Sequence, residues 1–97
     1  MISQAFEARR SQGRAALVPY VTAGYPAIDS TVPLLEALAS AGADVLELGI
    51  PFSDPLADGP TIQRSSFASL EGGTTVRSVL ADLRVFRSRN ATPVVLM

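Results

Sequence analysis

Three carboxylates lie close together in this sequence, at and just beyond an apolar segment. Glu47 stands inside the apolar run, and Asp54 and Asp58 follow it in a stretch rich in proline. A carboxylate among apolar side chains costs free energy unless it is paired or has a function, and prolines restrict the conformations of a loop. We therefore expect this segment to hold its acids in a fixed geometry, as proton transfer requires.

The composition of the chain limits which groups can carry out chemistry. The sequence contains no Cys, no His and no Lys, and all eight of its cationic residues are Arg. Thiolate and imidazole metal ligands are therefore absent, as is a His-assisted nucleophile. A Schiff base to a carbonyl substrate or to pyridoxal phosphate needs a Lys. We expect proton transfer by Asp, Glu or Tyr.

Length and charge place the chain among small globular proteins. At 97 residues with a formal net charge of −1, we expect residues 1–97 to form one domain at most, or part of one. No apolar stretch approaches the roughly 18 residues of a membrane span, and residues 1–14 do not resemble a secretory signal, so we expect a cytoplasmic protein. Arg84, Arg87 and Arg89 end a predicted helix, where cations suit the helix dipole, and we expect no nucleic-acid partner.

Helices and strands are predicted to alternate along the chain. We expect helices over residues 2–12, 30–41, 60–71 and 76–90, and strands over residues 15–21, 44–49 and 94–97. Pro60 suits the first position of a helix, Gly72 and Gly73 end it, and Thr74 or Thr75 caps the next one. The last helix is expected to bury one apolar stripe, formed by Val76, Val79, Leu80, Leu83 and Phe86.

This alternation predicts an α/β fold with a parallel sheet and right-handed crossovers. The candidates are the opening of a (β/α)8 barrel and a doubly wound open sheet. The Gly-rich signature of dinucleotide binding is absent after the first strand, which favours the barrel. Because a barrel needs about 250 residues, we predict the N-terminal part of a TIM barrel. Glu47 then lies toward the carboxyl end of the second strand, where active sites of such barrels occur.

Each of the three acids also has a structural interpretation. Glu47 could be a buried carboxylate satisfied by backbone N–H groups. Asp58 could be the N-cap of the helix that begins near Pro60, and Asp54 could stabilise a Ser-Asp-Pro turn. The residues alone leave these alternatives open.

Two segments resemble a known family. Residues 47–63, ELGIPFSDPLADGPTIQ, and residues 19–24, PYVTAG, resemble the tryptophan synthase α subunit. The resemblance implies a lyase of L-tryptophan biosynthesis that cleaves indole-3-glycerol phosphate to indole and glyceraldehyde 3-phosphate. That retro-aldol reaction uses neither metal nor cofactor. The resemblance also implies a partner, the pyridoxal-phosphate β subunit, in an α2β2 heterotetramer.

The resemblance gives each acid a role. Glu47 corresponds to the general acid/base that protonates the indole ring, and Asp58 to the acid beside the indole N–H that stabilises positive charge on the ring. Protonating an aromatic carbon creates a cation, so a neutral acid must donate while a second carboxylate stays charged. Asp54 belongs to a loop that communicates with the β subunit.

The same resemblance implies a pocket for the indole ring. Tyr20 occupies a position that the family fills with an aromatic residue lining this pocket, and Ile62 and Met97 lie near it. Members of the family are more than twice as long, with phosphate-binding loops in the second half of the barrel. We therefore expect the 97-residue chain alone to be inactive.

Two other functions are compatible with the sequence. The first is a non-catalytic folding or interaction unit that associates through exposed strand edges. The second is a different barrel lyase or isomerase acting on a sugar phosphate, for which the absence of Lys excludes only the Schiff-base aldolases.

Overall fold

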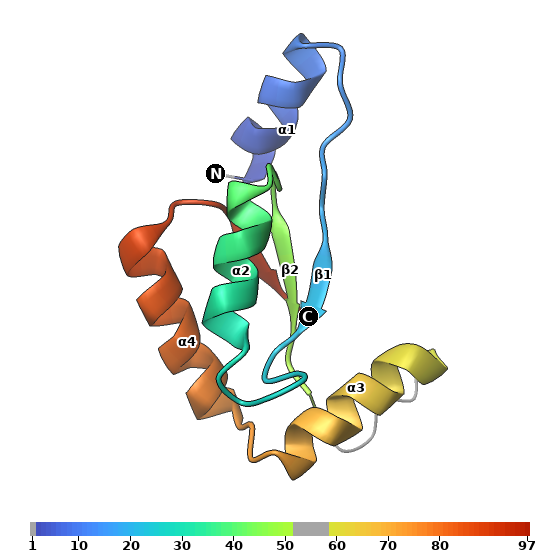
Figure 1. The fold of residues 1–97 in the computed structure, drawn as a ribbon. Helices are drawn as coiled ribbons and strands as arrows, with labels where there is room; N and C mark the ends of the chain where they lie inside the picture. Colours follow the sequence, from blue (N-terminus) through green and yellow to red (C-terminus); the bar gives the residue numbers. More distant parts are fainter. Residues whose placement is uncertain (1, 52–58) are drawn as a thin grey trace.

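The computed structural model describes residues 2–51 and 59–97. Helices and strands follow one another as α1 (Ile2–Ser11), β1 (Tyr20–Thr22), α2 (Thr31–Ser40), β2 (Leu46–Gly49), α3 (Pro60–Glu71), α4 (Val76–Arg89) and β3 (Val94–Leu96). This confirms the predicted order. Figure 1 shows α1 at the end of the sheet where the strands begin and α3 at the end where they finish. No described helix is both long enough and apolar enough to cross a membrane.

The strands form a parallel sheet in the order β1-β2-β3. Tyr20 is paired with Glu47, and Glu47 with Val95, so these three residues form one row across the sheet. Among the described strands, β1 and β3 are the edges. The sheet is therefore open on both sides.

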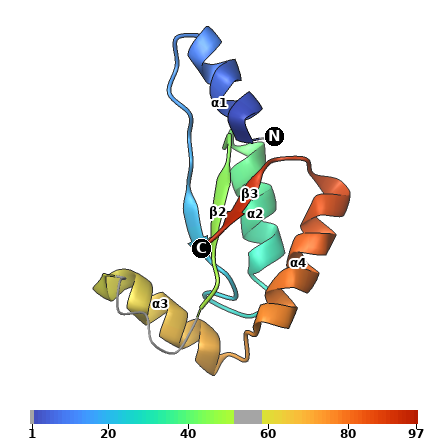
Figure 2. The ribbon, with the colours of Figure 1, turned by 180° about the vertical axis from the view of Figure 1, so that it is seen from behind.

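Helices α2 and α4 lie on the same face of this sheet, as the two opposite views show (Figures 1 and 2). The core between the helices and the sheet contains Leu46 and Leu48 of β2, together with Leu35 of α2 and Val79 and Phe86 of α4. Each of these five side chains is fully buried. Alternate residues of a strand point to opposite faces, so Tyr20, Glu47 and Val95 lie on the face that these helices do not cover.

The predicted helix ends are confirmed where local chemistry determines them. Pro60 is the first residue of α3, and Gly72 is its C-cap. Thr75 caps α4 through a reciprocal pair of hydrogen bonds with Ser78, in which each side chain accepts from the other residue's backbone N–H. Asn90 follows the last helical turn.

Two local predictions are wrong. The first strand was expected over residues 15–21 but begins at Tyr20. Pro19 has no N–H, and the Leu17 N–H donates to the Asp44 carboxylate at 2.8 Å instead of to a neighbouring strand. In α4, Val76 and Leu80 are about half exposed instead of buried. The helix packs on α2 and the sheet through Val79 and Phe86, which turns the Leu80 side toward the edge strand β3.

The N-terminal helix is attached by charge rather than by apolar packing. None of its residues is buried. The Arg9 guanidinium donates to the Asp44 carboxylate at 2.5 Å, which ties α1 to the segment before β2. Asp44 therefore joins three parts of the chain: α1, the approach to β1 and the start of β2.

Candidate functional site

Glu47 lies on the open face of the sheet, between Tyr20 and Val95. Its neighbours in sequence, Leu46 and Leu48, point into the core on the opposite face. The expectation that Glu47 is buried among these leucines is therefore wrong, because alternation along the strand separates them. The Glu47 side chain is half-buried and accessible from the open face.

Glu47 is held in place by its backbone, not by its carboxylate. Its N–H donates to the Pro19 carbonyl at 2.9 Å. Within residues 2–51 and 59–97, the carboxylate has no hydrogen-bond or ion-pair partner. The structural alternative, a carboxylate satisfied by backbone N–H groups, finds no support among these residues. Among the described residues, the geometry leaves this carboxylate open to contact from the uncovered face of the sheet.

Tyr20 lies across the strand that carries Glu47. A methyl group added at Gly49 would overlap the Tyr20 hydroxyl and ring. Glycine at this position therefore lets the aromatic ring rest on the backbone of β2, close to the row that contains Glu47. Sequence reasoning missed Gly49, although a glycine inside an apolar strand is a recognised sign of close approach.

The structure brings Tyr20 and Ile62 together. They line a groove of about 330 Å³ between β1, α2 and α3, together with Thr22, Tyr25 and Ser65. Most of its surface is apolar, as in sites that bind small molecules. Tyr20 comes from the first strand and Ile62 from the first turn of α3, so the groove lies near the carboxyl ends of the strands.

Hydroxyl groups fasten α3 to the end of β1. Ser65 shares a hydrogen bond of 2.8 Å with Thr22. Ser69, which is fully buried, donates to the Ala23 carbonyl at 2.5 Å and accepts from the Thr74 hydroxyl at 2.8 Å. Sequence reasoning missed this set of contacts. The spacing of Ser65 and Ser69, one helical turn apart, was the available signal.

The other predicted site residues are not all brought to this groove. Met97 follows β3, at the far edge of the sheet from Tyr20, and is 59% exposed. Its N–H donates to the Leu48 carbonyl and its own carbonyl accepts from the Ile50 N–H, which continues the parallel pairing. Asp54 and Asp58 lie outside the described residues. The N-cap of α3 is Gly59.

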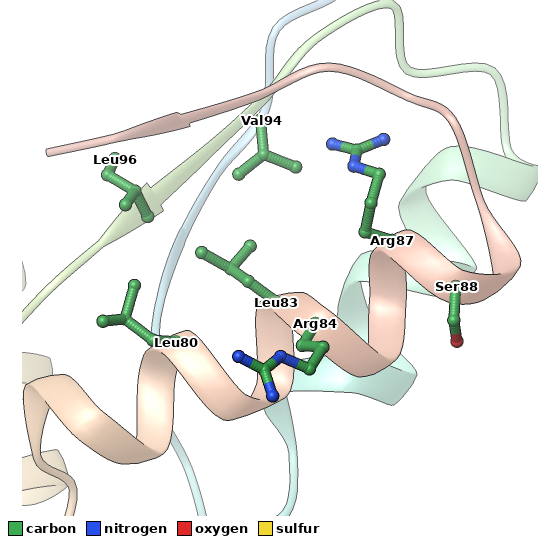
Figure 3. A pocket seen from close by; sticks show the side chains of 7 residues that line it. All are labelled: Leu80, Leu83, Arg84, Arg87, Ser88, Val94 and Leu96. Atoms are coloured by element: carbon green, nitrogen blue, oxygen red, sulfur yellow. The ribbon is translucent and has the colours of Figure 1, made fainter.

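A second groove, of about 690 Å³, lies between α4 and β3. Figure 3 shows Leu80 and Leu83 of the helix facing Val94 and Leu96 of the strand, with Arg84 and Arg87 at the margin. Val94 and Leu96 are paired with Leu46 and Leu48, so they share the face opposite Glu47. No carboxylate lines this groove, and it is not part of the candidate site.

Two carboxyl groups with shifted pKa values lie outside the site. The Leu17 N–H and the Arg9 guanidinium lower the pKa of Asp44. Burial raises the pKa of Asp82 on α4, against the opposing effect of the Thr31 hydroxyl. Asp44 precedes the sheet and Asp82 belongs to the helical layer. Both are structural carboxylates.

Known proteins are similar to this chain both in sequence and in the arrangement of helices and strands. The family model described as tryptophan synthase alpha chain matches residues 6–97. The tryptophan synthase alpha chain of Burkholderia ambifaria is 58% identical over 97 residues, which cover 99% of this chain and 36% of the relative. The chain therefore spans about a third of the length of such relatives.

Solved structures agree with this match. The tryptophan synthase subunit alpha from Legionella pneumophila superimposes with a TM-score of 0.93 at 43% identity, over 99% of this chain and 37% of the other. The tryptophan synthase complex from Pyrococcus furiosus gives a TM-score of 0.79 at 48% identity, over 84% of this chain and 34% of the other. The fold is the N-terminal part of a (β/α)8 barrel, and the chain belongs to the tryptophan synthase alpha chain family.

Proposed function

We propose that this chain supplies the catalytic acids of an α chain that cleaves indole-3-glycerol phosphate to indole and glyceraldehyde 3-phosphate. One observation carries the proposal. The Glu47 carboxylate has no partner within the described residues and shares a row with an aromatic side chain, Tyr20, on the open face of the sheet. Family membership supports the same activity.

The proposed chemistry needs one acid that donates and one that stays charged. Glu47 gives its proton to the indole carbon that bears the glycerol chain. The resulting cation is stabilised by the Asp58 carboxylate beside the ring N–H. When the carbon–carbon bond breaks, its electron pair returns to the ring and restores aromaticity. The adjacent hydroxyl gives its proton to the Glu47 carboxylate, which restores the acid, and becomes the aldehyde of glyceraldehyde 3-phosphate.

The binding residues follow from the groove that Tyr20, the register partner of Glu47, lines. Tyr20 and Ile62 present apolar surfaces from β1 and α3, which suits a flat indole ring. Met97 would contact the substrate from the β3 side. Asp54 is proposed to act in communication with a β subunit. The Pyrococcus furiosus relative is a tryptophan synthase complex, which supports such a partner. The α2β2 stoichiometry is part of the proposal.

A hybrid α chain tests this function. In the hybrid, the present sequence replaces the matched 36% of the Burkholderia ambifaria α chain. We expect release of indole from indole-3-glycerol phosphate at a rate close to that of the parent. The 97-residue chain alone is expected to release none. A well-folded hybrid without lyase activity would refute the proposal.

A second candidate function is that of an interaction unit. The open edges of β1 and β3 favour it, because unpaired strand edges invite pairing with another copy of the chain. Light scattering of the 97-residue chain at increasing concentration separates the two ideas. Growth in size with concentration supports edge pairing, and a constant monomer mass argues against it.

A further inference from the structure

A pair of hydroxyl groups joins the two walls of the groove that Tyr20 and Ile62 line. Thr22 Oγ1 and Ser65 Oγ lie 2.8 Å apart, and the two residues are only 6% and 8% exposed. Thr22 belongs to β1, which carries Tyr20, and Ser65 belongs to α3, which carries Ile62. The hydrogen bond therefore spans the space between the strand wall and the helix wall.

Each hydroxyl also contacts the wall residue of its own element. Ser65 Oγ donates to the Ile62 carbonyl at 3.0 Å. A serine hydroxyl has a single proton, so Thr22 is the donor in the bond that the two hydroxyls share. On the strand side, Thr22 Oγ1 lies 3.4 Å from the Tyr20 hydroxyl, a long polar contact. The series of contacts runs from Tyr20 through Thr22 and Ser65 to Ile62.

We propose that Thr22 and Ser65 are positioning residues that set the width of the groove for a flat aromatic ring. They hold Tyr20 and Ile62 at a fixed separation and do not themselves meet the reacting atoms. A buried hydrogen bond between two elements holds them in place, and Ser65→Ala or Thr22→Val removes this link between β1 and α3. This inference rests on the proposed function. It identifies the residues that set the width of the proposed substrate pocket.

The test uses the hybrid α chain with Ser65→Ala, Thr22→Val and the double variant. We expect each single change to raise the KM for indole-3-glycerol phosphate roughly two- to tenfold. The kcat should change little, because the walls hold the ring equally in the ground and transition states. The double variant should be no worse than the single ones, because either change already breaks the bond. Thr22→Ser keeps the hydroxyl and should retain the parental KM.

Ser66→Ala is the matched control. Ser66 lies on the same helix and is only 4% exposed. The hydrogen bond of Thr22 is to Ser65, not to Ser66. Its substitution should lower thermal stability without changing KM. An unchanged KM in Ser65→Ala, or additive effects of Ser65→Ala and Thr22→Val, would overturn the inference.

Direct binding of indole to the same variants separates this inference from the proposed function. If the parental hybrid binds indole but does not cleave the substrate, the proposed function fails while the inference is still tested. If Ser65→Ala binds indole two- to tenfold more weakly than the parental hybrid, the inference about Thr22 and Ser65 is supported. Equal affinity of Ser65→Ala and the parental hybrid refutes it.

Discussion

Tyr20 and Glu47 are register partners on the neighbouring parallel strands β1 and β2, so their side chains stand on the same face of the sheet. That face is opposite the one covered by α2 and α4. An aromatic surface and a carboxylate without a partner in the described residues are thereby placed side by side. This relationship places the proposed ring-binding wall beside the proposed proton donor.

The close approach of Tyr20 to Gly49 gives the first prediction. Gly49→Ala in the hybrid α chain should displace the Tyr20 ring, because the new methyl group would occupy the position of its hydroxyl. We expect a higher KM for indole-3-glycerol phosphate and a loss of about 1–3 kcal/mol in the free energy of unfolding. Steady-state kinetics and urea denaturation measure the two effects.

Gly72→Ala is the control for this substitution. Gly72 has a φ of −76°, and an added methyl group would meet only ordinary contacts there. It should leave the KM unchanged. If Gly49→Ala leaves the KM unchanged, as Gly72→Ala should, then the position of the Tyr20 ring does not depend on glycine at position 49.

Asp44 gives a prediction about pH. The Leu17 N–H and the Arg9 guanidinium hold the pKa of Asp44 below its ordinary value of 3.8. The folded state therefore favours the charged form, and the stabilisation is present above the ordinary pKa and lost as pH falls through the lowered one. Asp44→Asn should lower the urea midpoint of the hybrid at neutral pH.

The difference in urea midpoint between Asp44→Asn and the parental hybrid should shrink as the pH falls below about 4, because the unfolded-state carboxylate is protonated first and the folded-state one only at its lowered pKa. Urea titrations of both proteins at neutral and acidic pH measure this difference in midpoint. Glu7→Gln on α1 removes an exposed carboxylate and serves as the control. A constant difference across this pH range would contradict the role assigned to Asp44.

The cap of α4 gives a stability prediction. Thr75→Ala removes the side-chain oxygen that accepts the Ser78 N–H at 3.1 Å. We expect a loss of about 1 kcal/mol in the free energy of unfolding, while Thr75→Ser, which keeps the oxygen, should lose little. Equal stability of the two variants would show that the capping hydrogen bonds contribute nothing measurable.

The sequence predicts elements best where a single residue determines a boundary. Pro60 begins α3, Gly72 ends it and Thr75 caps α4, because each effect acts within one turn of the chain. The burial of Leu80 could not be predicted in the same way. An apolar stripe shows which side of a helix tends to be covered, but burial also depends on a neighbouring element.

The candidate site could be predicted only in part. The motif around Glu47 identifies the acid, but the partnership of Glu47 with Tyr20 depends on the register of two strands that are far apart in sequence. The Thr22–Ser65 hydrogen bond joins residues 43 positions apart. Hydroxyl residues are common on helices, and nothing local shows which of them face a strand.

Glu47→Gln in the hybrid α chain tests the central claim most directly. Glutamine keeps the size of the side chain but cannot donate a carboxylic proton. The cleavage rate for indole-3-glycerol phosphate should fall by a factor of about 10² to 10⁴, with the circular dichroism spectrum and urea midpoint retained. Turnover within a few fold of the parental hybrid would contradict the assignment of Glu47 as the proton donor.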